Sequence, residues 1–112
     1  MIKQKTLNMV NGNGYVITLD PKEGFSKVIA KSTVTCWVKT VATARNGVAP
    51  SVPTDPTPAS GASTDYYRML ANEVINFGFE AMKGGDDSFV DTIQYLLVWC
   101  DGGNGLFTTV SH

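Results

Sequence analysis

The sequence predicts an all-β fold: an antiparallel β-sandwich or a jelly-roll-like barrel with a long Pro-rich inserted loop. Two observations predict it. Short runs rich in Val, Ile, Thr and aromatic residues recur along the chain, and turn signals of Gly, Asn and Pro separate them at regular intervals. This spacing favours antiparallel strands over alternating strands and helices. With 112 residues, the chain is expected to form one domain with a core of its own, over residues 1–112.

Four strands are expected before the loop. They are Thr6 to Val10, Tyr15 to Leu19, Phe25 to Lys31 and Thr33 to Ala42. In the last of them the residues alternate with a period of two, so Cys36 and Val38 point into the core while Trp37 and Lys39 point the other way. The alternation therefore places a large ring, Trp37, on the more solvated face.

Four more strands are expected after the loop. They are Tyr66 to Ala71, Glu73 to Met82, Phe89 to Cys100 and Leu106 to Val110. For Asp65 to Ala71 a helix capped by Thr64 or Asp65 is the alternative. In Glu73 to Met82 the alternating apolar residues share one face, which favours a strand.

The run Phe89 to Cys100 is apolar on both of its faces. Such a run is typical of a central strand that is covered on both sides, or of a strand at a subunit contact. The Asp-Gly-Gly-Asn-Gly turn that follows predicts a hairpin between this strand and Leu106 to Val110.

The loop covers Asn46 to Thr64 and has an unusual composition. It holds four of the five prolines: Pro50, Pro53, Pro56 and Pro58. Proline lacks the backbone N–H that a strand ladder or a helix interior needs. The loop is also far longer than a simple hairpin connection. Three roles stay open: an arm lying along a neighbouring subunit, a surface loop without fixed structure, or a binding loop.

Charge and hydropathy exclude some classes of function. The net charge is −1, and the nine basic residues form no cluster. Nucleic-acid binding is not expected, since phosphate contacts need clustered Lys and Arg. Neither a secretory signal nor a bilayer-spanning apolar run is visible, so no membrane association is expected.

Catalytic and metal-binding patterns are also missing. The one histidine is His112, the last residue, where fraying is expected, so no hydrolytic triad is predicted. Four acidic residues could offer paired carboxylates for glycosidase-type hydrolysis, which is the alternative: Asp86, Asp87 and Asp91, which are close in sequence, and Asp101 after the next strand. Asp86 and Asp87 follow a Gly-Gly pair in a turn, where local backbone bonding explains them. Asp101 and Asn104 alone do not make a calcium loop. A non-enzymatic protein without cofactors is therefore expected.

The two cysteines, Cys36 and Cys100, are too far apart for a zinc or redox motif. Free buried thiols are favoured, with a disulfide and a reactive thiol as the alternatives. Aromatic residues suggest where contacts form: Trp37, Trp99, Tyr66 and Tyr67 are expected in a core or protein interface, with a sugar-binding platform as the alternative. Together with the four prolines they are the candidate interface residues.

Three segments flank a variable loop: Leu19 to Lys39 before it, and Tyr67 to Met82 and Ile93 to Phe107 after it. These segments resemble small bacteriophage virion proteins of the head decoration, or cement, type. The resemblance implies a virion protein, assembled in the host cytoplasm, that stabilises the shell by bridging capsid subunits. Its partners would be the major capsid protein and copies of itself, as a homo-oligomer or bound to the lattice. A carbohydrate-binding or host-recognition module is the alternative function.

Overall fold

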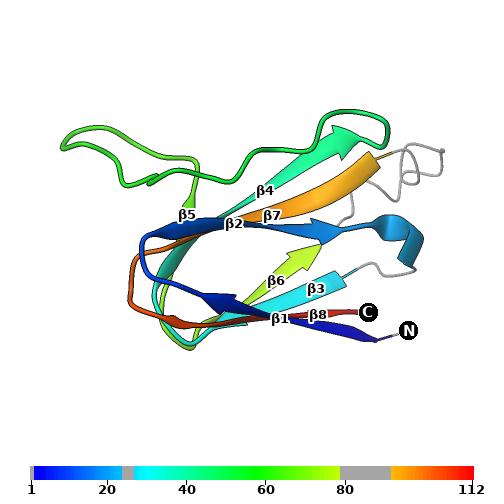
Figure 1. The fold of residues 1–112 in the computed structure, drawn as a ribbon, viewed down its shortest axis with the longest axis horizontal. Coiled ribbons are helices and arrows are strands. Elements are labelled where there is room, and N and C mark those ends of the chain that lie inside the picture. The colour runs from blue at the N-terminus through cyan, green and yellow to red at the C-terminus, as the bar shows by residue number, and fades with distance from the viewer. Residues whose placement is uncertain (1, 24–26, 79–91) are drawn as a thin grey trace.

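The computed structural model describes residues 2–23, 27–78 and 92–112, which form an all-β fold. The elements are β1 (Lys3–Met9), β2 (Asn13–Leu19), the 3-10 turn η1 (Pro21–Glu23), β3 (Lys27–Ser32), β4 (Cys36–Ala44), β5 (Tyr67–Met69), β6 (Val74–Gly78), β7 (Thr92–Cys100) and β8 (Gly105–Ser111). Two antiparallel four-stranded sheets pack face to face as a β-sandwich, which confirms the predicted class (Figure 1). No described helix has the length and apolar character needed to cross a bilayer.

The order of the strands shows how the chain is wound. Sheet A has the order β1-β8-β3-β6, and sheet B has the order β2-β7-β4-β5. The pairs β1–β8, β2–β7, β3–β6 and β4–β5 are those of one long hairpin that has been rolled up. This is the pairing of an eight-stranded jelly roll. The proline-rich loop joins β4 to β5 and is therefore the tip of the rolled hairpin.

The core lies between the two sheets, where the predicted alternation is observed. Cys36 and Val38 of β4 are buried, whereas Trp37 and Lys39 on the opposite face are half-buried. Residues from both sheets fill the core: Met9, Ile17, Leu19, Val28, Ala30, Cys36, Val38, Met69, Leu96, Val98, Cys100 and Phe107. The stability of the fold depends chiefly on this buried apolar surface.

The predicted hairpin between the last two strands is wrong. β7 belongs to sheet B and β8 to sheet A, where β8 pairs with β1 and β3. The glycines in the connection between β7 and β8 instead allow it to pack closely against another part of the chain. A Cβ at Gly102 would lie 2.7 Å from the Thr35 carbonyl oxygen, and one at Gly105 would lie 2.7 Å from the Thr33 hydroxyl. The connection thus packs against the β3–β4 connection, which also crosses between the sheets.

Two asparagines tie together the crossing connections at this end. Asn11 donates its backbone N–H to Asn104 Oδ1 at 2.9 Å, and Asn11 Oδ1 accepts the N–H of Gly103 at 3.1 Å. The C-terminus is also held, because the backbones of His112 and Lys27 exchange two hydrogen bonds of 3.0 Å. The expected fraying of His112 is therefore not observed.

The first and last residues of the observed strands agree with the predicted ones to within a few residues. The helix alternative for Asp65 to Ala71 is wrong, because Tyr67–Met69 pairs with β4 as β5. The strand predicted over Glu73 to Met82 is observed as β6 (Val74–Gly78). Parts of the expected strands, 25–26, 79–82 and 89–91, lie outside the described residues.

Candidate functional site

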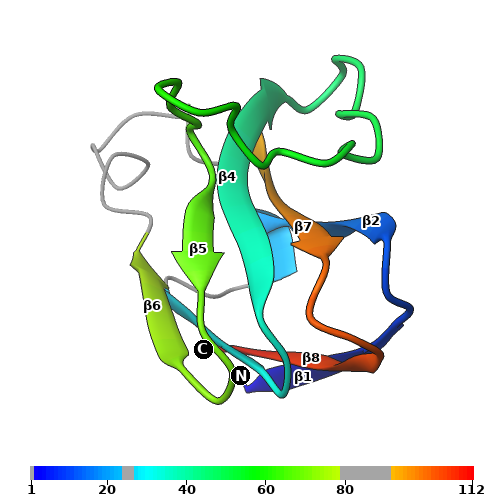
Figure 2. The ribbon, with the colours of Figure 1, turned by 90° about the vertical axis from the view of Figure 1, so that its left-hand side faces the viewer.

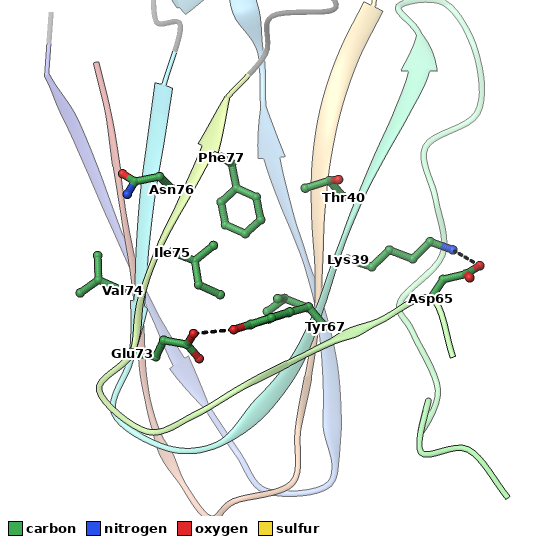
Figure 3. Close-up of a pocket in the computed structure, with 10 residues that line it drawn as sticks. Lys39, Thr40, Asp65, Tyr67, Glu73, Val74, Ile75, Asn76 and Phe77 are labelled. Atoms are coloured by element: carbon green, nitrogen blue, oxygen red, sulfur yellow. Dashed lines mark hydrogen bonds and ion pairs between the residues drawn. The ribbon is translucent and has the colours of Figure 1, made fainter. Parts of the chain in front are cut away.

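The candidate functional site is a groove of about 600 Å³ on one open side of the sandwich. We call it the edge groove. It is lined by Val38, Lys39, Thr40, Asp65, Tyr67, Glu73, Val74, Ile75, Asn76 and Phe77 (Figure 3). These residues come from β4, β5 and β6, from the turn between β5 and β6, and from the segment that leads into β5. Sheet A and sheet B therefore both contribute a wall.

The groove exists because β5 is short. Its three residues pair with only Cys36–Val38 of the nine-residue β4. Beyond Val38, β4 has no strand partner on this side within the described residues. On the other wall, β6 pairs only with β3 among the described residues and forms the edge of sheet A there. Both strands lie toward the same side of the molecule as β5 (Figure 2). The groove is thus bordered by two sheet edges.

The floor of the edge groove is apolar. Ile75 and Phe77 pair with Ala30 and Val28 of β3, which are fully buried, so the two larger side chains point between the sheets. Figure 3 shows them directed toward the β4 wall. Val38 adds a buried apolar side chain from the other sheet. This floor suits an apolar side chain of a partner molecule.

A tyrosine and a glutamate are joined at the rim. Tyr67 donates its hydroxyl to Glu73 Oε2 at 2.5 Å, and the backbone N–H of Leu70 donates to Glu73 Oε1 at 2.9 Å. The hydrogen bond from Tyr67 is the largest cause that lowers the pKa of Glu73, and the bond from Leu70 is the next. The Tyr67–Glu73 bond also raises the pKa of Tyr67. The turn between β5 and β6 contains Asn72 at φ 65°, a left-handed conformation that asparagine tolerates. The rim thus carries a fixed negative charge.

The other wall carries a positive charge. The Lys39 ammonium lies 3.8 Å from the Asp65 carboxylate and 5.7 Å from the centre of the Tyr66 ring. Because the Asp65 side chain is 88% exposed, this pair contributes little to stability. Its charges are therefore available to a partner at small cost.

An exposed apolar patch adjoins the groove at the β5–β6 turn. Tyr67 is 51% exposed, Leu70 is 59% exposed and Val74 is 54% exposed. Tyr67 and Val74 also line the groove, so exposed apolar groups lie at its rim as well as in its floor. Exposed apolar groups gathered around one turn are typical of interaction sites.

A second cluster of aromatic residues lies on the outer face of sheet B. Trp37 and Trp99 are directly opposite each other in the β4–β7 register. The Arg68 guanidinium stands 4.8 Å from the Trp37 ring centre. Asp101 accepts the Trp37 indole N–H at 3.1 Å and an Arg68 N–H at 2.6 Å. One face and the polar edge of Trp37 are therefore already occupied.

The proline-rich loop, residues 46–64, lies along the outer face of sheet B, and we call it the strap (Figure 1). Pro53 is buried, and Pro50, Pro56 and Pro58 are half-buried. A Cβ at Gly14 of β2 would lie 2.9 Å from Pro53 Cγ. The strap is thus an ordered part of this domain, and its far turn around Gly61 projects beyond the sheet.

The strap explains why β7 is apolar on both faces. Tyr95 and Leu97 alternate with the core residues and so face outward, yet each is only 7% exposed. β7 lies between β2 and β4, and the strap crosses the same side of the sheet (Figure 1). Of the two alternatives for this strand, the structure shows the central strand covered on both sides.

The predicted interface residues fall into three places. Tyr67 lines the edge groove and Tyr66 contacts its Lys39. Trp37 and Trp99 belong to the outer cluster, and the four prolines belong to the strap. Sequence reasoning missed Glu73, Ile75 and Phe77 as site residues. The shared face of the last two was predicted, but their place in a groove depends on β6 being the edge of the other sheet.

Two of the residues weighed for catalysis or metal binding, Asp101 and Asn104, have other partners. Asp101 binds Trp37 and Arg68, and Asn104 binds the Asn11 backbone. Within the described ranges, no three His, Cys, Asp or Glu side chains are grouped as metal ligands. Asp86, Asp87 and Asp91 lie outside those ranges.

Both cysteines are free and buried. Burial raises the pKa of Cys36 to about 11 and also raises the pKa of Cys100. Neither thiol is therefore activated as a nucleophile in the folded state.

Comparisons with protein-family models, with curated proteins and with solved structures find no match to this chain.

Proposed function

We propose that this protein is a non-enzymatic structural protein that binds other protein subunits through the edge groove. Its setting is a bacteriophage virion, where it acts as a capsid decoration protein. The observation that carries the proposal is the exposed apolar patch of Tyr67, Leu70 and Val74 beside the apolar groove floor. Protein interfaces have such a composition: apolar and aromatic at the centre, with polar groups around it.

The two sheet edges at the groove support the same conclusion. β6 presents one unpaired edge, and β4 presents another beyond Val38 in the described part of the chain. Unpaired strand edges bind extended segments of other chains, and proteins that stay monomeric usually protect them. Val74, at the start of β6, is instead apolar and exposed. A capsid subunit that places an extended, partly apolar segment here would bury this surface.

The fold is compatible with this setting. Jelly rolls occur in viral capsid proteins and also in lectins, so the fold alone supports either of the two functions considered. The resemblance of Leu19 to Lys39, Tyr67 to Met82 and Ile93 to Phe107 to decoration proteins favours the capsid. The partners would be the major capsid protein and neighbouring copies of this chain. Each bound copy would stabilise the shell by burying interface area at subunit junctions.

The strap contributes less to the contact with capsid subunits than an arm extended along a neighbouring subunit would. Its prolines lie against the protein's own sheet, as the burial of Pro53 shows. Its far turn, closed by the bond from Ala62 N–H to the Ala59 carbonyl at 2.9 Å, projects beyond the sheet (Figure 1). We therefore assign the main contact to the edge groove.

The test is binding to shells assembled from the major capsid protein of the same genome. The wild-type chain should co-sediment with the shells and raise their disruption temperature. Val74→Lys places a charge in the exposed patch without touching the core, and it should weaken binding at least tenfold. Val10→Lys, at an exposed apolar site near the opposite edge of sheet A, is the matched control and should bind normally. Absence of binding by the wild-type chain at micromolar concentration would refute the proposal.

Glycan binding is the second candidate, and one observation favours it. Tyr67 presents a half-exposed ring beside the Glu73 carboxylate, and sugar sites combine such a ring with polar acceptors. Trp37 is less suited, because Arg68 stands over its ring. A glycan array followed by titration with tryptophan fluorescence separates the two functions. A saturable glycan response that Tyr67→Ala removes would support this candidate over the first.

A further inference from the structure

Two thiols stand directly opposite each other inside the sandwich. Cys36 of β4 and Cys100 of β7 are register partners, both are fully buried, and both are free. We propose that they form a dithiol that closes to an intrachain disulfide in the presence of a disulfide oxidant. The bond would join the two central strands of sheet B.

The backbone geometry permits this bond. The carbonyl of Cys100 accepts the N–H of Gly12 at 2.7 Å, so it is directed toward β2 and away from β4. The N–H and C=O of a strand residue point to the same side, so Cys36 and Cys100 form a pair of the non-hydrogen-bonded type. In such pairs the Cα atoms are about 4.5 Å apart and the side chains lie close. That separation falls within the range of about 4.4–6.8 Å seen for disulfides.

The reaction with glutathione disulfide proceeds in two exchanges. A thiolate of one cysteine attacks the glutathione disulfide, which forms a mixed disulfide and releases one glutathione thiolate. The second cysteine then attacks the protein sulfur of the mixed disulfide and releases the second glutathione. The thiol protons of the two cysteines end on the two glutathiones. Two protein S–H bonds are thus replaced by one S–S bond, and the oxidant is reduced to two thiols.

The surroundings of the two cysteines make their reaction with a disulfide oxidant slow. Met69 pairs with Cys36 on β5 and is itself fully buried, so no oxidant reaches the thiol in the closed fold. Burial holds Cys36 in its thiol form at neutral pH. The Cys100 thiol donates to the Gly103 carbonyl at 3.1 Å, near the end of the sandwich. Oxidation therefore requires a local opening, and the short β5 is the nearest edge element.

The bond would close a loop that contains the strap and the edge groove. Such a link stabilises the fold by restricting the unfolded chain. Its use rests on the proposed function: the thiols stay reduced in the host cytoplasm and oxidise after virions are released into a more oxidising medium. The chemistry itself does not depend on capsids and is tested without them.

The experiment uses the purified full chain, reduced and then equilibrated with glutathione buffers of increasing disulfide content. Remaining thiols are alkylated in denaturant, and the intact mass is measured. The expected product lacks two hydrogens, carries no alkyl group and no glutathione, and unfolds several degrees higher than the reduced protein. Cys36→Ser and Cys100→Ser should each keep one alkylatable thiol or one glutathione and show no such rise.

The same wild-type chain in urea is the control that does not depend on a variant folding. There both thiols are accessible, so oxidation should be fast. If the native chain keeps both thiols while the unfolded chain is oxidised, or if it adds glutathione at both sites without forming the internal bond, the proposal is wrong. Either result leaves the capsid-binding test unaffected.

Discussion

Gly14 of β2 and Pro53 of the strap are in such close contact that no side chain fits between them. A Cβ at position 14 would lie 2.9 Å from Pro53 Cγ, 3.0 Å from Val52 Cγ1 and closer still to the Pro53 carbonyl oxygen. Gly14 is also the register partner of Trp99. The absence of a side chain here lets the strap approach the sheet and cover its apolar outer face.

Gly14→Ala should therefore loosen the strap. The added methyl meets backbone atoms that cannot move without shifting the segment, so the substitution should lower the free energy of unfolding by about 1–3 kcal/mol. Proteolysis between residues 46 and 64 should become faster. Thr18→Ala, at an exposed position on the same strand, is the control and should change neither property. Equal protease resistance of the Gly14 variant and the wild type would contradict the contact.

Replacing Ser51 to Ala62 by a short Gly-Ser turn tests what the strap does. The outer face of sheet B would lose the cover that Val52 and Pro53 give it at Gly14, and the free energy of unfolding should fall by about 2 kcal/mol or more. Shell binding per folded molecule should remain, because the edge groove is intact. Urea unfolding and co-sedimentation measure the two effects. A trimmed chain that is as stable as the wild type but no longer binds shells would assign the contact to the strap instead.

The ion pair of Asp20 and Arg45 predicts a pH dependence of stability. Two hydrogen bonds of 2.7 and 2.8 Å join them, and the bond to Arg45 is the main cause that lowers the pKa of Asp20 to about 2. A lowered pKa in the folded state means that the stabilisation is present above the ordinary value of 3.8 and is lost as pH falls from about 4 toward 2. Asp20→Asn should cost about 1–2 kcal/mol at pH 7, and this difference should shrink toward pH 2. Urea unfolding at both pH values checks it, and a cost independent of pH would contradict it.

The bond between Tyr67 and Glu73 predicts a shifted tyrosine titration. It is the first cause of the raised pKa of Tyr67 and of the lowered pKa of Glu73. Glu73→Gln removes the charge, so the pKa of Tyr67 should move back toward its ordinary value. NMR of the tyrosine ring carbons during a pH titration measures this change. Tyr66 provides the internal reference, because burial raises its pKa without any contribution from Glu73, so its titration should not respond. An unchanged Tyr67 titration would show that the pair does not form in solution.

Local patterns in the sequence predict the strands well. Alternation with a period of two depends only on neighbouring residues, so the inward face of β4, with Cys36 and Val38, was predicted correctly. The same holds for the two apolar faces of β7. The cover of its outer face was not predictable, because it depends on Pro53 meeting Gly14 across 39 residues of chain.

The connections between strands are where local patterns fail. The Asp101 to Gly105 run carries a hairpin signal, but here it crosses from one sheet to the other. Its glycines are needed where Gly102 meets Thr35 and Gly105 meets Thr33. A short-range signal does not distinguish a tight turn from a close crossing of two chain segments. The edge groove was missed for a related reason, since it arises from the short pairing of β5 with β4 and from the place of β6 in the other sheet.

Hydrogen–deuterium exchange of the chain, free and bound to shells, tests whether capsid subunits bind at the edge groove while the strap stays on its own sheet. Binding should slow exchange in Tyr67–Met69 and Val74–Gly78 and leave residues 46–64 nearly unchanged. Slower exchange confined to residues 46–64, with no change in the two strands, would instead place the capsid contact on the strap.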